Sequence, residues 1–285
     1  MSGTLFVVAT PIGNLEDITI RALRVLRDVA VIAAEDTRRT AQLLARHAIA
    51  TPTTSLHEHN ETRKSPSLVA RLVAGESIAL VSDAGTPTVS DPGERLIAAA
   101  ISAGIRVEPI PGPSAILAAL TASGLPTDSF SFLGFPPTRS KDRKRWLARM
   151  RHIGGTIVFF EAPHRIRATL RELSTAIGPC DVAIGRELTK VHEELVRGPI
   201  NEVMSVGFLE RGEFTVVVNV GLTPETWPVG VASPKVMLAE IGEMTATKPV
   251  SRRRAVQQLA KKYGLTPNVV YEAIEQAKKS GDRPT

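Results

Sequence analysis

The sequence is poor in cysteine, in aromatic residues and in long apolar runs. Cys180 is the only cysteine among 285 residues, so an intrachain disulfide is excluded and a reducing compartment is expected. No apolar run approaches the roughly 20 residues of a membrane-spanning helix. The N-terminus shows no basic segment followed by an apolar core, so no signal peptide is predicted. We therefore expect a cytoplasmic protein that does not bind a membrane.

Several nucleotide-binding and catalytic motifs are also missing. No G-x-G-x-x-G follows a predicted strand, and no phosphate-binding G-x-x-x-x-G-K-[ST] loop occurs, which argues against dehydrogenases and P-loop NTPases. The G-x-S-x-G elbow of the α/β-hydrolases is absent. His57 and His59 flank Glu58, but no further ligand stands at metal-binding spacing. No metal site is predicted.

What the sequence has instead is a dense loop after an apolar strand. Residues 77–81 form a continuous apolar run that predicts a buried strand, and residues 94–101 predict a helix. Between them lie two glycines, Gly85 and Gly93, together with two prolines and the carboxylate of Asp83 at the strand end. Turn formation alone could account for Asp and Gly. The density of such residues at a strand exit favours a ligand-binding loop.

Strands and helices alternate along most of the chain, which predicts parallel βαβ units and an α/β fold. We expect two α/β domains, residues 1–123 and 124–222, and a helical extension over residues 234–285. The predicted strands are residues 5–9, 29–34, 51–56, 77–81 and 106–110 in the first domain and 130–135, 156–160, 181–184 and 213–220 in the second. The main predicted helices are residues 18–28, 66–74, 94–101, 116–123, 139–151, 166–177 and 202–209.

Two further helices are predicted in the extension, over residues 251–263 and 267–278. A Gly follows the first and a Pro begins the second, as in a helix–turn–helix. A helical hairpin used for packing or dimerisation is equally compatible with this pattern.

Positive charge is concentrated in two segments, although the whole chain carries only +6. Residues 139–152 contain seven basic residues and one acidic residue, and residues 248–285 contain nine basic and three acidic residues. Each segment therefore has a net charge of +6, and the rest of the chain is acidic. Basic segments on an acidic protein suggest a polyanionic partner. A solvated helix face is the alternative for each segment.

The strand-exit loops suit a small ligand that has an amino end and a carboxyl end. Ser114 and Ala115 begin a predicted helix, where backbone N–H groups can bind a carboxylate. Asp83 can accept hydrogen bonds from an ammonium group or from ribose hydroxyls.

Seven segments resemble a family of ribosomal RNA methyltransferases within the tetrapyrrole methylase superfamily. They are residues 10–18, 35–38, 57–61, 82–93, 111–115 with 123–126, 160–165 and 185–190. The resemblance covers essentially the whole chain. It implies two α/β domains of tetrapyrrole methylase type with a cleft between them, plus a C-terminal helical (helix–turn–helix) extension. It also implies S-adenosyl-L-methionine in the cleft, a homodimer, and methyl transfer to the ribose 2′-hydroxyl of a cytidine in the decoding region of 16S rRNA.

The resemblance also implies site residues. The cofactor would be bound by Pro11, Asp83, Gly85, Thr86, Ser114 and Ala115 from the first domain and by Phe160, Glu161, Leu188, Gly212, Glu213 and Phe214 from the second. A group that assists removal of the hydroxyl proton would be Asp36, Glu58, Glu187 or Lys190, and positioning without a dedicated base is also possible. The expected RNA contacts are Arg38, His57, Arg143, Arg145, Arg186, Arg252, Arg253 and Arg254.

Two other functions share part of this pattern. A methylase of a porphyrin precursor or of a protein side chain would need the cofactor loops without the basic segments. A non-enzymatic RNA-binding factor of ribosome assembly would need the basic segments without a cofactor cleft.

Overall fold

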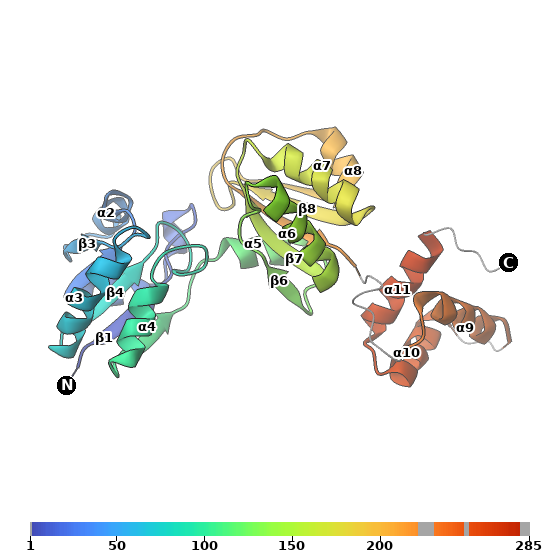
Figure 1. The fold of residues 1–285 in the computed structure, drawn as a ribbon, viewed down its shortest axis with the longest axis horizontal. Coiled ribbons are helices and arrows are strands. Elements are labelled where there is room, and N and C mark those ends of the chain that lie inside the picture. The colour runs from blue at the N-terminus through green and yellow to red at the C-terminus, as the bar shows by residue number, and fades with distance from the viewer. Residues whose placement is uncertain (1, 222–230, 248–250, 280–285) are drawn as a thin grey trace.

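The computed structural model describes residues 2–221, 231–247 and 251–279. Two sheets with their helices and a C-terminal group of helices follow one another along the molecule (Figure 1). Within these residues, none of the helices is long and apolar enough to cross a membrane.

The first sheet is parallel throughout, as the sequence predicted. Its strand order is β3-β2-β4-β1-β5. The strands are β1 (Thr4–Val8), β2 (Val31–Ala34), β3 (Thr53–Ser55), β4 (Ile78–Val81) and β5 (Arg106–Ile110). All residues of β2 and β4 are buried, because a parallel sheet of this kind is covered on both faces. The carboxyl ends of the strands share one edge, where the polar loops emerge.

Helices cover both faces of this sheet. One face packs against α1 (Ile20–Asp28) and α2 (Thr37–Arg46), and the other against α3 (Glu61–Val73) and α4 (Glu94–Ser102). Ala22, Val25 and Leu26 of α1 show the spacing that places apolar side chains on one helix face.

Helix α3 begins at Glu61, five residues before the predicted start at Pro66. The prediction was wrong because Pro66, which favours a first helical position, lies inside the helix. Glu61 is buried, and its Oε1 accepts hydrogen bonds from the N–H groups of Arg95 (2.8 Å) and Leu96 (3.2 Å). The start of α3 therefore caps the start of α4.

The second sheet is mixed, with the order β6-β7-β10-β8-β9. Its strands are β6 (Phe130–Phe132), β7 (Thr156–Glu161), β8 (Asp181–Arg186), β9 (Glu194–Pro199) and β10 (Phe214–Asn219). Strands β6 and β7 are parallel, and the other pairs are antiparallel. Helices α6 (Ser140–Ile153), α7 (Ile166–Ile177) and α8 (Ile200–Val206) cover one face.

Helix α5 (Ala115–Ser123) covers the other face of the second sheet, although the sequence analysis placed it at the end of the first domain. Its Ile116 and Leu120 share a core with Val158, Ala183 and Val217 of the second sheet. Because β5 of the first sheet leads directly into this helix, the amino-terminal end of α5 lies between the two sheets (Figure 1).

The C-terminal part contains α9 (Pro234–Thr247), α10 (Arg252–Tyr263) and α11 (Pro267–Lys279). The two predicted helices are confirmed, and α9 adds a third that packs with them around Met237, Leu259 and Ile274. Gly264 ends α10 in the left-handed region at φ 66°, which a glycine adopts without strain. Residues 222–230, in the stretch between the second predicted domain and the predicted extension, lie outside the described residues.

Candidate functional site

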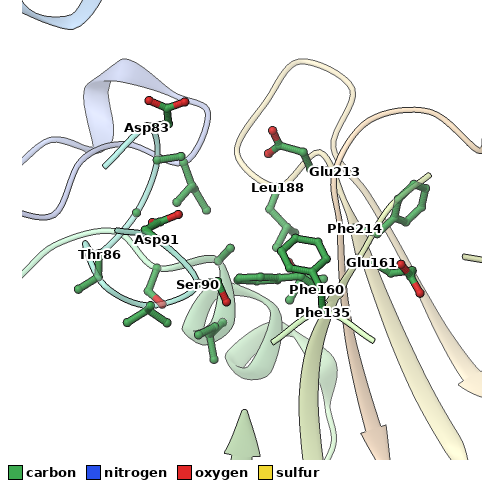
Figure 2. Close-up of a pocket in the computed structure, with 18 of the residues that line it drawn as sticks. Asp83, Thr86, Ser90, Asp91, Phe135, Phe160, Glu161, Leu188, Glu213 and Phe214 are labelled. Atoms are coloured by element: carbon green, nitrogen blue, oxygen red, sulfur yellow. The ribbon is translucent and has the colours of Figure 1, made fainter. Parts of the chain in front are cut away.

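A cavity of about 430 Å³ lies between the two sheets and is lined by residues of both (Figure 2). On the first-domain side it is bounded by the loops after β2 and β4 and by the start of α5. On the second-domain side it is bounded by the ends of β6 and β7 and by the loops around Leu188 and Gly212. A volume of this size suits a single small ligand. The site therefore lies where strand-exit loops were expected to bind one.

A short backbone pairing holds the first-domain loops together. Thr10 and Gly85 exchange two N–H···O hydrogen bonds, each 2.9 Å, in an isolated antiparallel bridge. Gly85 has φ 78°, a conformation that costs glycine little and most other residues more. The bridge brings the loop after β1 beside the loop after β4.

Three carboxylates gather at the first-domain end of the cavity. Asp83 Oδ1 accepts a hydrogen bond from the Asp36 N–H (2.9 Å), and Glu35 Oε2 accepts one from the Asp83 N–H (3.3 Å). Burial raises the pKa of Asp91 to about 6, and the negative charges of Glu35 and Asp83 add to that effect. Burial also raises the pKa of Glu35. This end of the cavity therefore favours the binding of positively charged groups or hydrogen-bond donors.

Arg39 is the cation nearest to this acidic group. Its Nη1 lies 3.4 Å from Asp83 Oδ2, and its side chain remains 62% exposed. Arg39, Glu35 and Asp91 all line the cavity, and none of them was predicted from the sequence to be a site residue. Glu35 and Arg39 flank residues that were predicted, and Asp91 lies in the loop after β4, so the available signal was proximity to other polar residues.

The amino-terminal end of α5, which follows β5 of the first sheet and packs on the second, lines the cavity between the two walls. Ser114 caps the helix, with its Oγ accepting from the Leu117 N–H at 3.5 Å. Ala115 and Ile116 are the first helical residues, and N–H groups in a first turn have no partner within the helix. Such groups bind carboxylates and other anions.

The opposite wall is apolar. Phe160 and Leu188 pack on the core around α5 and line the cavity, whereas the Phe214 side chain packs in the core on the other face of the sheet. The Phe160 ring packs edge-on against that of Phe132, with centroids 4.9 Å apart. This wall is suited to a flat, weakly polar ring. The cavity thus has an acidic end, an anion-binding helix start and an aromatic wall.

The two domains also touch beside the cavity. The Asn14 N–H donates a hydrogen bond to Thr189 Oγ1 at 3.0 Å. A Cβ on Gly13 would lie 2.4 Å from Lys190 Cγ and 3.0 Å from the backbone oxygen of Leu188. The loop after β1 and the loop after β8 are therefore in contact only because residue 13 has no side chain.

Replacing Gly13 by alanine should weaken ligand binding while the two domains stay folded. The added methyl group must push Lys190 and the Leu188 carbonyl away, which moves one wall of the cavity. We expect on the order of a 10-fold lower affinity for the cavity ligand, because small displacements are costly in a positioned site. Calorimetry of the variant, with Gly242→Ala as a control in which the new Cβ has nothing within 4 Å, tests this. Equal affinities in the two variants would show that the contact has no role in binding.

Eleven of the twelve residues predicted to bind the cofactor line this cavity: Asp83, Gly85, Thr86, Ser114, Ala115, Phe160, Glu161, Leu188, Gly212, Glu213 and Phe214. Pro11 is buried next to the lining residue Ile12 and is not itself in the lining. The Glu161 carboxylate is fully buried and accepts hydrogen bonds from the Ala162 N–H (2.7 Å) and from Thr169, and it pairs with Arg165. The buried Glu161 carboxylate thus holds in place the residues that support the second-domain wall of the cavity.

The four candidates for assisting proton removal lie outside the lining of this cavity. Asp36 caps α2, and hydrogen bonds from Arg38 lower its pKa to about 2. Glu58 is exposed in the turn before α3. Because its pKa is lowered, Asp36 accepts a proton poorly near neutral pH. Asp36 is therefore best described as the cap of α2.

Glu187 and Lys190 form an ion pair of 2.9 Å, and Lys190 also pairs with Glu213 at 3.0 Å. Burial alone would raise the pKa of Glu187, but hydrogen bonds from Lys190 and the Glu213 N–H lower it overall. Burial would lower the pKa of Lys190, and its two carboxylate partners raise it overall. Glu187 is therefore ionised and Lys190 protonated at neutral pH, and together they fix the loop that carries Leu188.

The predicted RNA contacts differ in their availability. Arg143 is buried and donates to Glu172 Oε2 (2.6 Å) and to Thr169, and Arg186 is buried and donates to Glu194 Oε2 at 2.8 Å. Their guanidinium groups thus donate to acceptors within the second domain and are not presented to a partner. The remaining candidates are at least partly exposed: Arg38, His57, Arg145, Arg252, Arg253 and Arg254. Arg38 pairs with Asp36, Arg145 with Asp142 and Arg252 with Glu275.

The exposed basic residues of α6 lie on one face of that helix. Lys141, Lys144, Arg145 and Arg149 are exposed at three- and four-residue spacings, and Trp146, Leu147 and Met150 are buried on the opposite side. This basic face, defined by Lys141, Lys144, Arg145 and Arg149, is available to a partner of opposite charge.

Known proteins resemble this chain in sequence and in fold. The family described as Tetrapyrrole (Corrin/Porphyrin) Methylases matches residues 4–204. "Ribosomal RNA small subunit methyltransferase I" of Halalkalibacterium halodurans is 42% identical over 96% of this chain and 95% of that protein. The protein of the same name from Pseudomonas aeruginosa is 41% identical over 98% of this chain and 99% of its own length.

Two solved structures share the fold at low sequence identity. Diphthine synthase superimposes with a TM-score of 0.60 at 16% identity and covers 79% of this chain and 93% of its own. A uroporphyrin-III C-methyltransferase from Thermus thermophilus, complexed with S-adenyl homocysteine, has a TM-score of 0.54 at 19% identity and covers 76% of this chain and 97% of its own. These structures support the two-sheet architecture.

Proposed function

The chain belongs to the tetrapyrrole (corrin/porphyrin) methylase family, and we propose that it methylates the ribose 2′-hydroxyl of a cytidine in the decoding region of 16S rRNA. Its methyl donor is S-adenosyl-L-methionine, and its substrate class is ribosomal RNA. The observation that carries the proposal is the coexistence of a two-sided donor cavity with an exposed basic helix face on one chain.

The cavity residues fit this donor. The carboxylates of Asp83 and Glu35 can accept hydrogen bonds from the donor's ammonium group or ribose hydroxyls. The first-turn N–H groups of α5 can bind its carboxylate. Phe160 and Leu188 offer an apolar surface for its adenine ring. Each chemical part of the donor therefore has a complementary wall.

The donor supplies a methyl group on a positively charged sulfur, which is already activated for transfer. The work left to the protein is to hold the donor and the ribose oxygen in line and to exclude water. Well-aligned reactants can gain about 7–11 kcal/mol in this way. The loops fixed by the Thr10–Gly85 bridge and by the Asn14–Thr189 hydrogen bond provide that alignment from both domains.

Donor binding should depend on pH because Asp91 faces Glu35 and Asp83, with Ser82 and Arg39 close by. The folded-state pKa of Asp91 is raised to about 6, so the carboxyl group is protonated below that pH. A cationic donor favours the ionised form, so binding should release a proton near pH 6. From this linkage we expect the affinity to fall about fourfold between about pH 7.5 and about pH 5.5.

Calorimetry measures the released proton when a sulfonium analogue of the donor that keeps its ammonium group is titrated in buffers of different ionisation enthalpy. S-adenosylhomocysteine, which lacks the sulfonium charge, is titrated in parallel. Asp91→Asn should bind the analogue without that proton release. An identical proton release from wild type and variant would assign the titration to another group.

The basic face of α6 favours RNA over the small substrates that the fold also serves. A porphyrin precursor or one protein side chain does not need a row of cations beyond the cavity, whereas an RNA backbone does. The proposal includes the small ribosomal subunit as the partner and a homodimer as the assembly. It keeps the domain limits near residues 123 and 222 along the chain, with α5 at the end of the first segment packing on the second sheet.

One assay separates the candidate functions. Labelled donor is incubated with small ribosomal subunits, with a porphyrin precursor or with protein, and nuclease digestion then identifies the labelled nucleoside. We expect label in a 2′-O-methylated cytidine from the decoding region. Label in a base, in a porphyrin or in protein would refute the proposed substrate, and binding of subunits without transfer would indicate a non-enzymatic assembly factor.

A further inference from the structure

Phe135 is an exposed aromatic residue at the cavity. It follows β6, lines the cavity from the second-domain side and keeps 55% of its surface accessible. Figure 2 shows it beside Phe160, across from the loop that carries Thr86, Ser90 and Asp91. Exposing so large an apolar ring is unfavourable in water. Its position at a ligand cavity suggests that another flat group covers it.

The backbone holds Phe135 in place. Gly134 has φ 61°, and its carbonyl accepts a hydrogen bond from the Phe160 N–H at 3.0 Å. The Phe135 ring packs against Phe160 with centroids 5.5 Å apart. Ser90 Oγ from the first domain lies 3.7 Å from the position of a Cβ on Gly134. The ring is thus a platform that packs on Phe160 at a narrow contact between the domains.

The donor does not require this platform. Phe160, Leu188 and Ile116 already line the interior of the cavity with apolar atoms. Phe160 is only partly exposed, whereas Phe135 is open to solvent over more than half of its surface. A second aromatic ring, from outside the cavity, can therefore stack on Phe135 while the donor occupies the interior.

The surroundings of Phe135 fit a nucleotide. Helix α6 begins at Ser140, five residues further along, at the same end of the sheet as the carboxyl ends of β6 and β7. Lys141, Lys144 and Arg149 continue from there as an exposed basic face. An RNA strand whose phosphates follow this face would place a base near Phe135. Bases stack on aromatic side chains in single-stranded RNA recognition.

We infer that Phe135 stacks on the base of the nucleotide that receives the methyl group and so positions its ribose at the donor. The inference rests on the proposed function, because it needs an RNA substrate. It assigns to Phe135 a role in substrate positioning and leaves donor binding to the other cavity residues.

The test compares Phe135→Ala, Phe135→Leu, Phe135→Tyr and Phe135→Trp with the wild-type chain. Methyl transfer to small subunits gives kcat and KM, and calorimetry with S-adenosylhomocysteine gives donor affinity. Stacking on an aromatic side chain corresponds to on the order of a 10- to 100-fold effect. We expect kcat/KM to fall by this factor in the Ala and Leu variants and to be largely retained in Tyr and Trp, with donor affinity unchanged in all four.

Phe130→Ala is the matched control. Phe130 lies at the other end of the same short strand, is 42% exposed and does not line the cavity, so its variant should behave as wild type. Three results would overturn the inference: full activity of Phe135→Ala, full activity of Phe135→Leu, or a loss of donor affinity that matches the loss of kcat/KM. A wild-type chain that transfers no methyl group to RNA would instead refute the proposed function before any variant is measured.

Discussion

Replacing Asp83 by alanine is expected to reduce donor affinity on the order of 100-fold while the chain stays folded. The carboxylate is only 25% exposed, lies at the cavity and is oriented by the Asp36 N–H at 2.9 Å and by Arg39 at 3.4 Å. Hydrogen bonds that involve a charged group contribute about 1.5–3 kcal/mol each. Loss of one or two such bonds to the donor accounts for the expected factor.

Calorimetry with S-adenosyl-L-methionine measures this effect, and circular dichroism with thermal unfolding checks the fold. Asp83→Asn keeps an oxygen that can accept from the Asp36 N–H, so it separates the charge from the geometry. Glu108→Gln is the control, since Glu108 is a carboxylate of the same domain that pairs with Arg21 and Arg106 and does not line the cavity. Wild-type affinity in Asp83→Ala would remove Asp83 from the proposed site.

Reversing three charges on the basic face of α6 should abolish most of the binding to small subunits. In a Lys141→Glu, Lys144→Glu, Arg149→Glu variant, the affinity should fall on the order of 100-fold at physiological salt. The slope of log affinity against log salt should decrease by about 3, because each lost phosphate contact removes close to one released counterion. Donor affinity should not change, since none of the three residues lines the cavity.

The control for this variant is Arg24→Glu, Arg46→Glu, Arg106→Glu, which makes the same change in net charge on the first domain. All three control residues are exposed. Subunit binding measured by filter retention across a salt series distinguishes a local surface from an effect of total charge. Equal losses in the two triple variants would show that only net charge matters and that α6 is not a specific RNA surface.

The sequence was a good guide to the residues at the ends of strands. Asp83, Gly85 and Ser114 each lie within a short polar stretch that follows an apolar run. In a parallel sheet such stretches meet at one edge, so their convergence on one cavity follows from topology. The α/β class and the order of most elements could be predicted because apolar periodicity is a local signal.

The sequence was a poor guide to pairings between distant segments. Arg143 lies in a strongly basic segment, yet it is buried because Glu172, 29 residues away, accepts from its guanidinium. Helix α5 follows the first sheet along the chain but packs on the second, since its apolar side chains fit Val158 and Val217 there. Neither partner can be identified from local composition.

The same limit explains the residues that were not selected. Asp91 and Phe135 have roles only because the two domains enclose a common cavity. In sequence, Asp91 reads as a turn residue and Phe135 as the end of an apolar stretch. Their exposure and surroundings come from elements far apart along the chain.

The central claim is that the methyl donor binds between the two sheets, with its charged groups toward Asp83 and α5 and its adenine ring toward Phe160 and Leu188. A crystal structure of the chain soaked with S-adenosylhomocysteine measures this directly. The account predicts density for the ligand between the loop after β4 and the loop that carries Leu188. Density at another surface, or side chains that fill this cavity in the complex, would contradict it.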